Sequence, residues 1–276
     1  MNKEKSQSTM RENGVFIVEP THGLCNRLRV IRSALNLAQR INFKVVVLWR
    51  VNDELGCKYE DLFETSNLFK VINVKGKYFS KIYCRLKQLS SDILITQKDV
   101  KNNKEDSLLS KIKEKSPKKI YIKTFDEFYI SQPQIDYDWL IPVENLRKRI
   151  EEIVSQVGKN GKGIHIRRTD NSVAIEKSPI ELFIDQIKQD IENDSQTKFY
   201  LATDDKEVKK LLKESFNSNV YTTSDVLNRN SREGMQASVV DLFVLSKMSL
   251  IYGSHWSSFS EEAAKIGNID LRVLRK

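Results

Sequence analysis

Short runs of β-branched and aromatic residues alternate with stretches of helical periodicity along this chain of 276 residues. The runs GVFIVEP at 14–20 and KVVVLW at 44–49 have the composition of buried strands. Between them, apolar residues recur at helical spacing: Leu24, Leu28, Ile31, Leu35, Ala38 and Ile41. A strand, a helix and a second buried strand form a βαβ unit, so we predict parallel sheets covered by helices. Arg27, off the apolar stripe of this helix, is expected on the surface.

The alternation continues to the end of the chain. Residues 50–125 carry three further candidate strands, LFKVINV, SDILIT and KKIYIK, among polar linkers. Beyond residue 161 we predict strands at 162–167, 198–202, 219–222, 249–252 and 271–274, with helices at 180–191, 205–215, 235–248 and 257–267. The fold class is therefore α/β with two Rossmann-like lobes.

The segment QPQIDYDWLIPVEN at 132–145 carries two prolines and leads into a helical pattern, which is typical of a domain boundary. We predict an N-terminal, acceptor-side lobe at 14–141 and a C-terminal lobe at 142–276. Residues 1–13 lack the apolar region of a signal peptide. This polar segment is expected to form a disordered tail.

The cysteine content and the net charge indicate the cellular compartment and the class of binding partner. Three cysteines without a CxxC pair favour a reducing, cytoplasmic location over a disulfide framework or a structural zinc site. The net charge of +9 favours an anionic partner: a nucleotide, a nucleic acid or an acidic membrane. Nucleic acid is the weakest of these, because the lysines are scattered and no RNA-binding aromatic motif is present.

The stretch from Lys70 to Ser91 contains six basic residues and no acidic one, with Tyr78, Phe79 and Tyr83 interleaved. It is either a solvated face with some core aromatics or a docking surface for an anionic acceptor or membrane. Peripheral contact with an anionic membrane at its inner face is therefore left open.

Four polar segments follow predicted strands: THGLCNR (21–27), HIRRTDN (165–171), ATDD (202–205) and YGSHWSSFS (252–260). Ligands of open parallel sheets bind beyond the carboxyl ends of the strands, so these segments are the candidate site. Each of the three histidines lies in one of them and is expected to form hydrogen bonds near a ligand rather than to bind a metal.

The first and the last of these segments are expected to present helix N-termini, which attract anions. In the first, Gly23 is expected at the turn, and Asn26 either reaches a phosphate or sugar or caps the helix. In the last, Ser254, Ser257 and Ser258 make a similar phosphate-binding arrangement.

The adjacent Arg167 and Arg168 end a buried strand. Because successive strand residues point to opposite faces, one is expected to clamp a diphosphate and the other to hold the loop through a carboxylate such as Asp170. Asp204 and Asp205 are expected mainly to start a helix, with ligand contact as the alternative. Asp241, in an apolar helix, either pairs with an arginine or accepts from a base edge or a sugar hydroxyl.

Together these segments resemble the fucosyltransferase superfamily that includes alpha-1,6-fucosyltransferases, nodulation fucosyltransferases and protein O-fucosyltransferases. The resemblance rests on GLCNRLR, HIRRTD, FYLATDD and DLFVLSKMSLIYGSHWSSFSEEAA, in the family's order. It implies a GT-B-like fold with two lobes facing a central cleft, GDP-β-L-fucose as donor, inversion at the anomeric carbon and no metal cofactor. The acceptor would be a bacterial-type glycan or lipid-linked saccharide, as in polysaccharide biosynthesis.

The resemblance also implies residue roles. Arg167 would hold the β-phosphate and Arg168 would be more structural, while His165 and Asp241 would recognise the guanine. Ser257 or Ser258 would bind phosphate, and Gly23 and Asn26 would form the loop facing the donor. Asp204 and Ser254 join the donor-binding set from their strand-end positions.

The general base is not fixed by the resemblance. The family's glutamate has no exact match, and Glu176 is nearest, with Asp170 and Glu181 as further candidates. Two other functions stay open: a transferase that uses another nucleotide sugar, and a non-catalytic nucleotide- or glycan-binding protein of the same fold.

Overall fold

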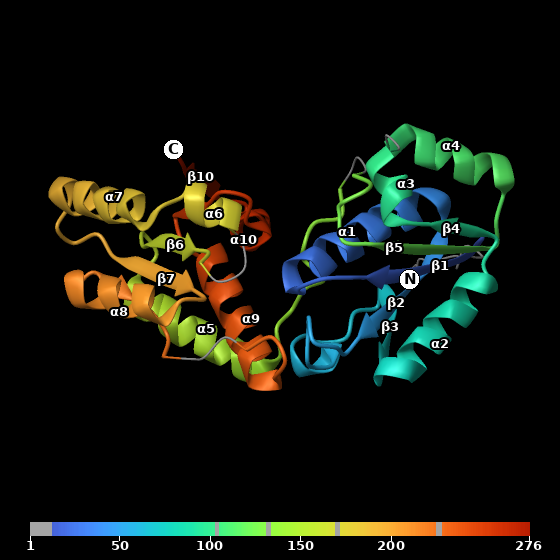
Figure 1. The fold of residues 1–276 in the computed structure, drawn as a ribbon, viewed down its shortest axis with the longest axis horizontal. Coiled ribbons are helices and arrows are strands. Elements are labelled where there is room, and N and C mark those ends of the chain that lie inside the picture. The colour runs from blue at the N-terminus through green and yellow to red at the C-terminus, as the bar shows by residue number, and fades with distance from the viewer. Residues whose placement is uncertain (1–12, 103–104, 131–133, 169–171, 225–227) are drawn as a thin grey trace, which may run out of the picture. The chain divides into compact units, whose positions relative to one another are not determined.

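The computed structural model describes residues 13–102, 105–130, 134–168, 172–224 and 228–276 (Figure 1). They form two compact units. The first comprises the described part of Met1–Thr21, with Arg27–Arg50 and Ser66–Ile135; the second comprises His22–Asn26, Val51–Thr65 and Asp136–Lys276. Whereas the sequence suggested a division between residues 141 and 142, the second unit begins at Asp136 and also takes in two loops from the N-terminal half.

The first unit is built on a parallel sheet of five strands in the order β3-β2-β1-β5-β4. Its strands are β1 (Gly14–Pro20), β2 (Phe43–Arg50), β3 (Phe69–Val74), β4 (Ile93–Ile95) and β5 (Lys119–Thr124). The helices α1 (Leu24–Ile41), α3 (Gln97–Asn102) and α4 (Glu105–Lys115) lie on one face, and α2 (Lys77–Leu89) lies on the other (Figure 1). Buried apolar side chains on both faces explain why the strands read as continuous hydrophobic runs.

One helical residue departs from its expected place. Arg27 is fully buried, because its Nη1 donates to the Arg50 carbonyl oxygen at 2.6 Å and its guanidinium lies 5.1 Å from the Trp49 ring centroid. The prediction that Arg27 lies on the surface is therefore wrong. A carbonyl acceptor and an aromatic face together replace the water that a buried cation loses.

The second unit repeats the architecture with a parallel sheet in the order β10-β9-β6-β7-β8. Its strands are β6 (Lys162–Ile166), β7 (Phe199–Thr203), β8 (Val220–Tyr221), β9 (Leu250–Ser254) and β10 (Asp270–Leu274). Its helices are α5 (Glu144–Val157), α6 (Ser172–Lys177), α7 (Ile180–Asn193), α8 (Lys206–Ser215), α9 (Arg232–Ser246) and α10 (Ser258–Gly267), and η1 (Tyr59–Asp61) is a short 3₁₀ turn.

The core of the second unit forms between the sheet and its helices. Phe183 and Ile187 of α7 and Val208 and Leu212 of α8 pack with the apolar residues of β6 and β7. The helix α9 is buried over most of its length and packs against α5 and α10. The α/β class with two parallel sheets is thereby confirmed.

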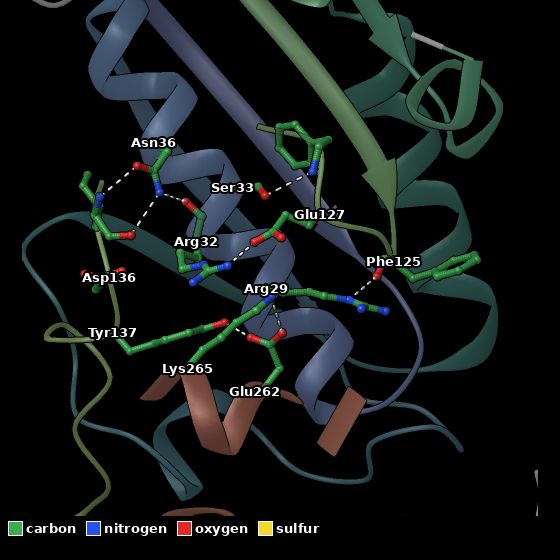
Figure 2. A network of polar contacts seen from close by, with 12 residues as sticks. Arg29, Arg32, Ser33, Asn36, Phe125, Glu127, Asp136, Tyr137, Glu262 and Lys265 are labelled. Atoms are coloured by element: carbon green, nitrogen blue, oxygen red, sulfur yellow. Dashed lines mark hydrogen bonds and ion pairs between the residues drawn. The ribbon is translucent and has the colours of Figure 1, made fainter. Parts of the chain in front are cut away.

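The chain passes from the first unit to the second for the last time at residues 135 and 136, and each side of this point is anchored. In the first unit, Asn36 of α1 exchanges hydrogen bonds with the backbone of Ile135 at 2.8 and 3.0 Å. In the second, the Tyr137 hydroxyl donates to the buried carboxylate of Glu262 on α10, which Lys265 also contacts (Figure 2). The boundary is therefore held by side chains on both of its sides.

Two further findings concern the cysteines and the length of the helices. Cys25, Cys57 and Cys84 are free and buried. Among the described residues, none of the helices combines the length and apolar character that a bilayer crossing requires.

Candidate active site

A pocket of about 410 Å³ opens at the carboxyl ends of the strands of the second unit, and every residue that lines it belongs to that unit. Arg167 follows β6, Asp204 follows β7, and residues 256–259 follow β9. The order of strands reverses between β6 and β9, which are neighbours in the sheet. This switch point is where open α/β sheets bind ligands, and the volume is in the range of small-molecule sites.

The Arg167 guanidinium is held in the pocket by a carboxylate. Its Nη1 lies 2.8 Å from Oδ2 of Asp204, and its backbone N–H donates to the Ser254 hydroxyl at 3.1 Å. Both side chains of the ion pair are largely buried, so the arginine is positioned before any ligand arrives.

The two aspartates after β7 have separate roles. Asp205 is the N-cap of α8, and its carboxylate accepts from the N–H groups of Glu207 and Val208. Asp204 instead accepts the Arg168 N–H at 2.8 Å and pairs with Arg167. Of the two aspartates expected at the helix start, Asp205 is therefore the N-cap, and Asp204 lies before it and pairs with Arg167.

Arg168 follows the end of β6 and is not among the residues that line the pocket. Its Nη1 donates to the Ile175 carbonyl oxygen at 3.3 Å, at the end of α6. Asp170, the carboxylate expected to hold this loop and a candidate base, lies outside the described residues. Glu176 is exposed on α6 and does not line the pocket, and Glu181 lies in the first turn of α7.

His165 forms the floor of the site on β6. Its buried ring stacks on Phe259 with centroids 4.9 Å apart, and its Nδ1 lies 3.3 Å from the Ser257 hydroxyl. Burial, followed by the nearby Arg167 charge, lowers the pKa of His165 to about 3. The imidazole is therefore neutral at physiological pH and offers one donor and one acceptor.

Asp241 of α9 lines the same pocket and is almost fully buried. The Tyr200 hydroxyl donates to its Oδ1 at 2.5 Å, a contact that the sequence did not suggest. Burial and the Asp241 charge raise the pKa of Tyr200, which keeps this hydroxyl protonated. A carboxylate held in this way can still accept from a ligand with its remaining lone pairs.

Two helix N-termini border the pocket. Gly23 and Asn26 line it at the start of α1, and Ser257 and Ser258 line it at the start of α10. The left-handed residue of the first turn is His22, with φ 67°, rather than Gly23. A Cβ on Gly23 would meet no atom within 4 Å, so this glycine leaves open space at the helix end where an anion would approach.

The structure also brings in residues that sequence reasoning missed, chiefly Glu54, Arg229 and Trp256. Glu54 accepts the His22 N–H at 3.0 Å. Its loop is tied to the segment before α9, because the Gly56 N–H donates to the Arg229 carbonyl oxygen at 2.7 Å. A Cβ at Gly56 would lie 2.3 Å from the Asn230 backbone, so only glycine allows this approach.

A signal for Glu54 was present in the sequence. Its loop follows β2, which pairs with β1, and carboxyl ends of parallel neighbours meet at one edge of a sheet. The four predicted site segments follow β1, β6, β7 and β9, and none of them includes this loop.

Within the described residues, no cluster of three or more His, Cys, Asp or Glu side chains has an arrangement suited to a metal ion. The charged groups that do line the pocket are two arginines and three carboxylates: Arg167, Arg229, Glu54, Asp204 and Asp241.

No protein-family model and no curated protein matches the chain in sequence. Solved structures match it in fold over nearly its whole length. NodZ alpha-1,6-fucosyltransferase soaked with GDP-fucose is 16% identical, with a TM-score of 0.61 and 93% of each chain covered. A FUT1 mutant from Arabidopsis thaliana in complex with GDP is 14% identical, with a TM-score of 0.62, and 94% of this chain and 69% of that chain are covered.

A third neighbour is POFUT1 in complex with GDP, at 10% identity and a TM-score of 0.51, with 95% of this chain and 99% of that chain covered. At these identities the likeness establishes a shared fold. The predicted GT-B-like class of two Rossmann-like lobes is confirmed, as is the resemblance to the fucosyltransferases at the level of the fold.

Proposed function

We propose that this protein is an inverting glycosyltransferase that transfers L-fucose from GDP-β-L-fucose to a saccharide hydroxyl. The observation that carries the proposal is the Arg167 guanidinium, held by Asp204 at the switch point of the second sheet. Structures of the same fold that contain GDP or GDP-fucose support the choice of donor.

The chemistry of transfer calls for a cation at this position. As the bond between the anomeric carbon and the β-phosphate oxygen breaks, negative charge grows on the departing GDP. A guanidinium fixed beside that oxygen stabilises the transition state more than the ground state, and it needs no reorganisation during the reaction. Arg167 takes this role, and the N-termini of α1 and α10 are placed to receive the rest of the diphosphate charge.

Recognition of the guanine is assigned to two buried polar groups of the pocket. The Asp241 carboxylate accepts from the base, and the neutral His165 adds a directional hydrogen bond or supports the phosphate-binding Ser257. The exposed ring of Trp256, at the rim of the pocket, offers a face on which a base or sugar can stack.

We assign the general base to Glu54. Of the three carboxylates that line the pocket, those of Asp204 and Asp241 are largely buried, whereas Glu54 is exposed, so an acceptor that arrives from solvent can reach it. In this scheme the acceptor hydroxyl gives its proton to Glu54, its oxygen bonds the anomeric carbon from the side opposite GDP, and GDP leaves. The earlier candidates Glu176 and Asp170 remain predictions to be compared with it.

In this proposal Arg167 and the two helix N-termini take up the charge of the diphosphate. No metal cofactor is therefore assigned, and transfer is expected to continue in EDTA. The acceptor is a glycan or lipid-linked saccharide of bacterial type. The three free, buried cysteines support a reducing, cytoplasmic location.

The direct test is release of GDP from GDP-fucose in the presence of a panel of saccharide acceptors, with UDP-sugars and GDP-mannose as competing donors. Acceptor-dependent GDP release and a fucosylated product support the proposal. Preference for another donor would point to a different transferase, and tight nucleotide binding without transfer would point to a binding protein of the same fold.

A further inference from the structure

The helix α2 of the first unit leaves a large apolar surface in water. Five side chains are at least 60% exposed: Tyr78, Phe79, Ile82, Leu86 and Leu89. At 100° per residue they fall within an arc of about 100° of the helix circumference. We call these five residues the α2 apolar face. Soluble monomers rarely expose a contiguous apolar surface of this kind unless it has a partner.

The opposite side of α2 fixes the helix to the sheet. Ser80 and Cys84 are buried, and Cys84 packs with Ile17, Leu48 and Tyr121 of the sheet. Small residues thus dock the helix, while its bulky residues point outward. The apolar face is therefore held outward by the packing of the fold.

Charge decides among possible partners for this surface. Lys77, Lys81 and Arg85 are exposed and follow one another at four-residue spacing along one edge of the apolar arc. No acidic residue lies between Lys70 and Ser91. A second copy of this face would bring the same positive charges together without a carboxylate from this stretch to compensate them.

An anionic bilayer surface complements both the α2 apolar face and its basic edge. Its hydrocarbon boundary accepts Phe79, Ile82, Leu86 and Leu89, aromatic residues favour the headgroup level, and lysine and arginine reach the lipid phosphates. We infer that the α2 apolar face and its basic edge form a docking site for anionic lipid membranes. This site lies in the first unit and is independent of the proposed transfer reaction.

The test is flotation of the full chain with vesicles, without donor or acceptor present. Vesicles of phosphatidylcholine alone are compared with vesicles that also contain phosphatidylglycerol. The wild type is expected to bind the anionic vesicles, to lose binding as salt is raised and to remain largely free with the neutral vesicles.

Two double variants separate the apolar and the charged contributions. Phe79→Gln with Leu86→Gln is expected to weaken binding by at least about tenfold. Lys81→Gln with Arg85→Gln is expected to weaken it by about 25-fold, at about fivefold for each charge. Matched controls on α8, Leu211→Gln and Lys206→Gln with Lys210→Gln, should leave binding unchanged. All these positions are exposed, so the fold should be retained, which circular dichroism checks.

Three results would overturn the inference. One is the absence of binding to anionic vesicles, and another is equal binding to neutral ones. The third is a concentration-dependent dimer in size-exclusion chromatography that Phe79→Gln with Leu86→Gln dissociates, because a second copy would then cover the face.

Discussion

Asp204 binds both arginines at the end of β6, through a different oxygen for each. Its Oδ2 lies 2.8 Å from the Arg167 guanidinium, and its Oδ1 accepts the backbone N–H of Arg168, also at 2.8 Å. The carboxylate therefore fixes the direction of the Arg167 guanidinium and the path of the chain that carries it. Arg167 is catalytic in the proposed scheme, whereas Asp204 is a positioning residue.

This pair gives the first prediction. Arg167→Ala should lower kcat for fucosyl transfer by about 10²–10³-fold, because a preorganised donor to the developing charge is lost. Asp204→Asn should give a smaller loss, mainly in kcat, because the cation remains but is less well oriented. Arg232→Ala, at an exposed arginine outside the pocket, is the control and should change kcat less than twofold. Wild-type kcat in Arg167→Ala would contradict the assignment.

The base assignment gives the second prediction. Glu54→Gln keeps the shape of the rim and removes the proton acceptor, so kcat should fall by about 10²–10⁴-fold while GDP affinity stays unchanged. Glu176→Gln, on the exposed side of α6, should transfer at the wild-type rate. Steady-state kinetics of both variants decide between the two carboxylates, since the opposite pattern would move the base to Glu176.

The buried histidine gives the third prediction, on stability. The unfolded chain protonates His165 near its ordinary pKa of 6.5, whereas the folded chain does so only near 3. Between these values the unfolded state binds more protons, so this histidine's contribution is complete above about pH 6.5 and falls by about 1.4 kcal/mol per pH unit below it.

Urea unfolding between pH 4.5 and 6.5 measures this slope. The unfolding free energy of His165→Gln should depend on pH less steeply than that of the wild type, by about 1.4 kcal/mol per pH unit. Equal slopes for His165→Gln and the wild type would show that His165 is not buried in its neutral form.

The contact between Tyr137 and Glu262 gives the fourth prediction (Figure 2). Tyr137→Phe removes one donor to a fully buried carboxylate and should destabilise the protein by about 1–3 kcal/mol, measured by urea unfolding. Tyr78→Phe, at an exposed tyrosine, should change the unfolding free energy by less than about 0.5 kcal/mol. Equal stability of the two variants would mean that the buried contact contributes nothing.

The strands and most of the site could be predicted from the sequence for one physical reason. Strands buried on both faces read as apolar runs, and the polar residues that follow them must lie at the sheet edge where ligands bind. Gly23, Asn26, His165, Arg167, Asp204, Ser257 and Ser258 were selected on that ground, and Asp241 was selected as an acidic residue in an apolar helix; all eight line the pocket. Ser254, selected with them, supports Arg167 from just outside it.

What could not be predicted depends on contacts between residues far apart in the chain. The burial of Arg27 requires Trp49 and the Arg50 carbonyl to meet it. The division of roles between Asp204 and Asp205 depends on the position of β6. The place of Glu54 depends on the contact of Gly56 with Arg229, more than 150 residues away. Helical and strand periodicity carry no information on such pairs.

The central claim is that a fixed guanidinium receives the diphosphate of a guanosine-linked sugar, and calorimetric titration of GDP into wild type and Arg167→Ala tests it most directly. GDP should bind the wild type more tightly than UDP or ADP, equally well with EDTA present, and Arg167→Ala should lose most of that affinity. Unchanged GDP binding in Arg167→Ala, or binding that disappears when divalent cations are chelated, would contradict the claim.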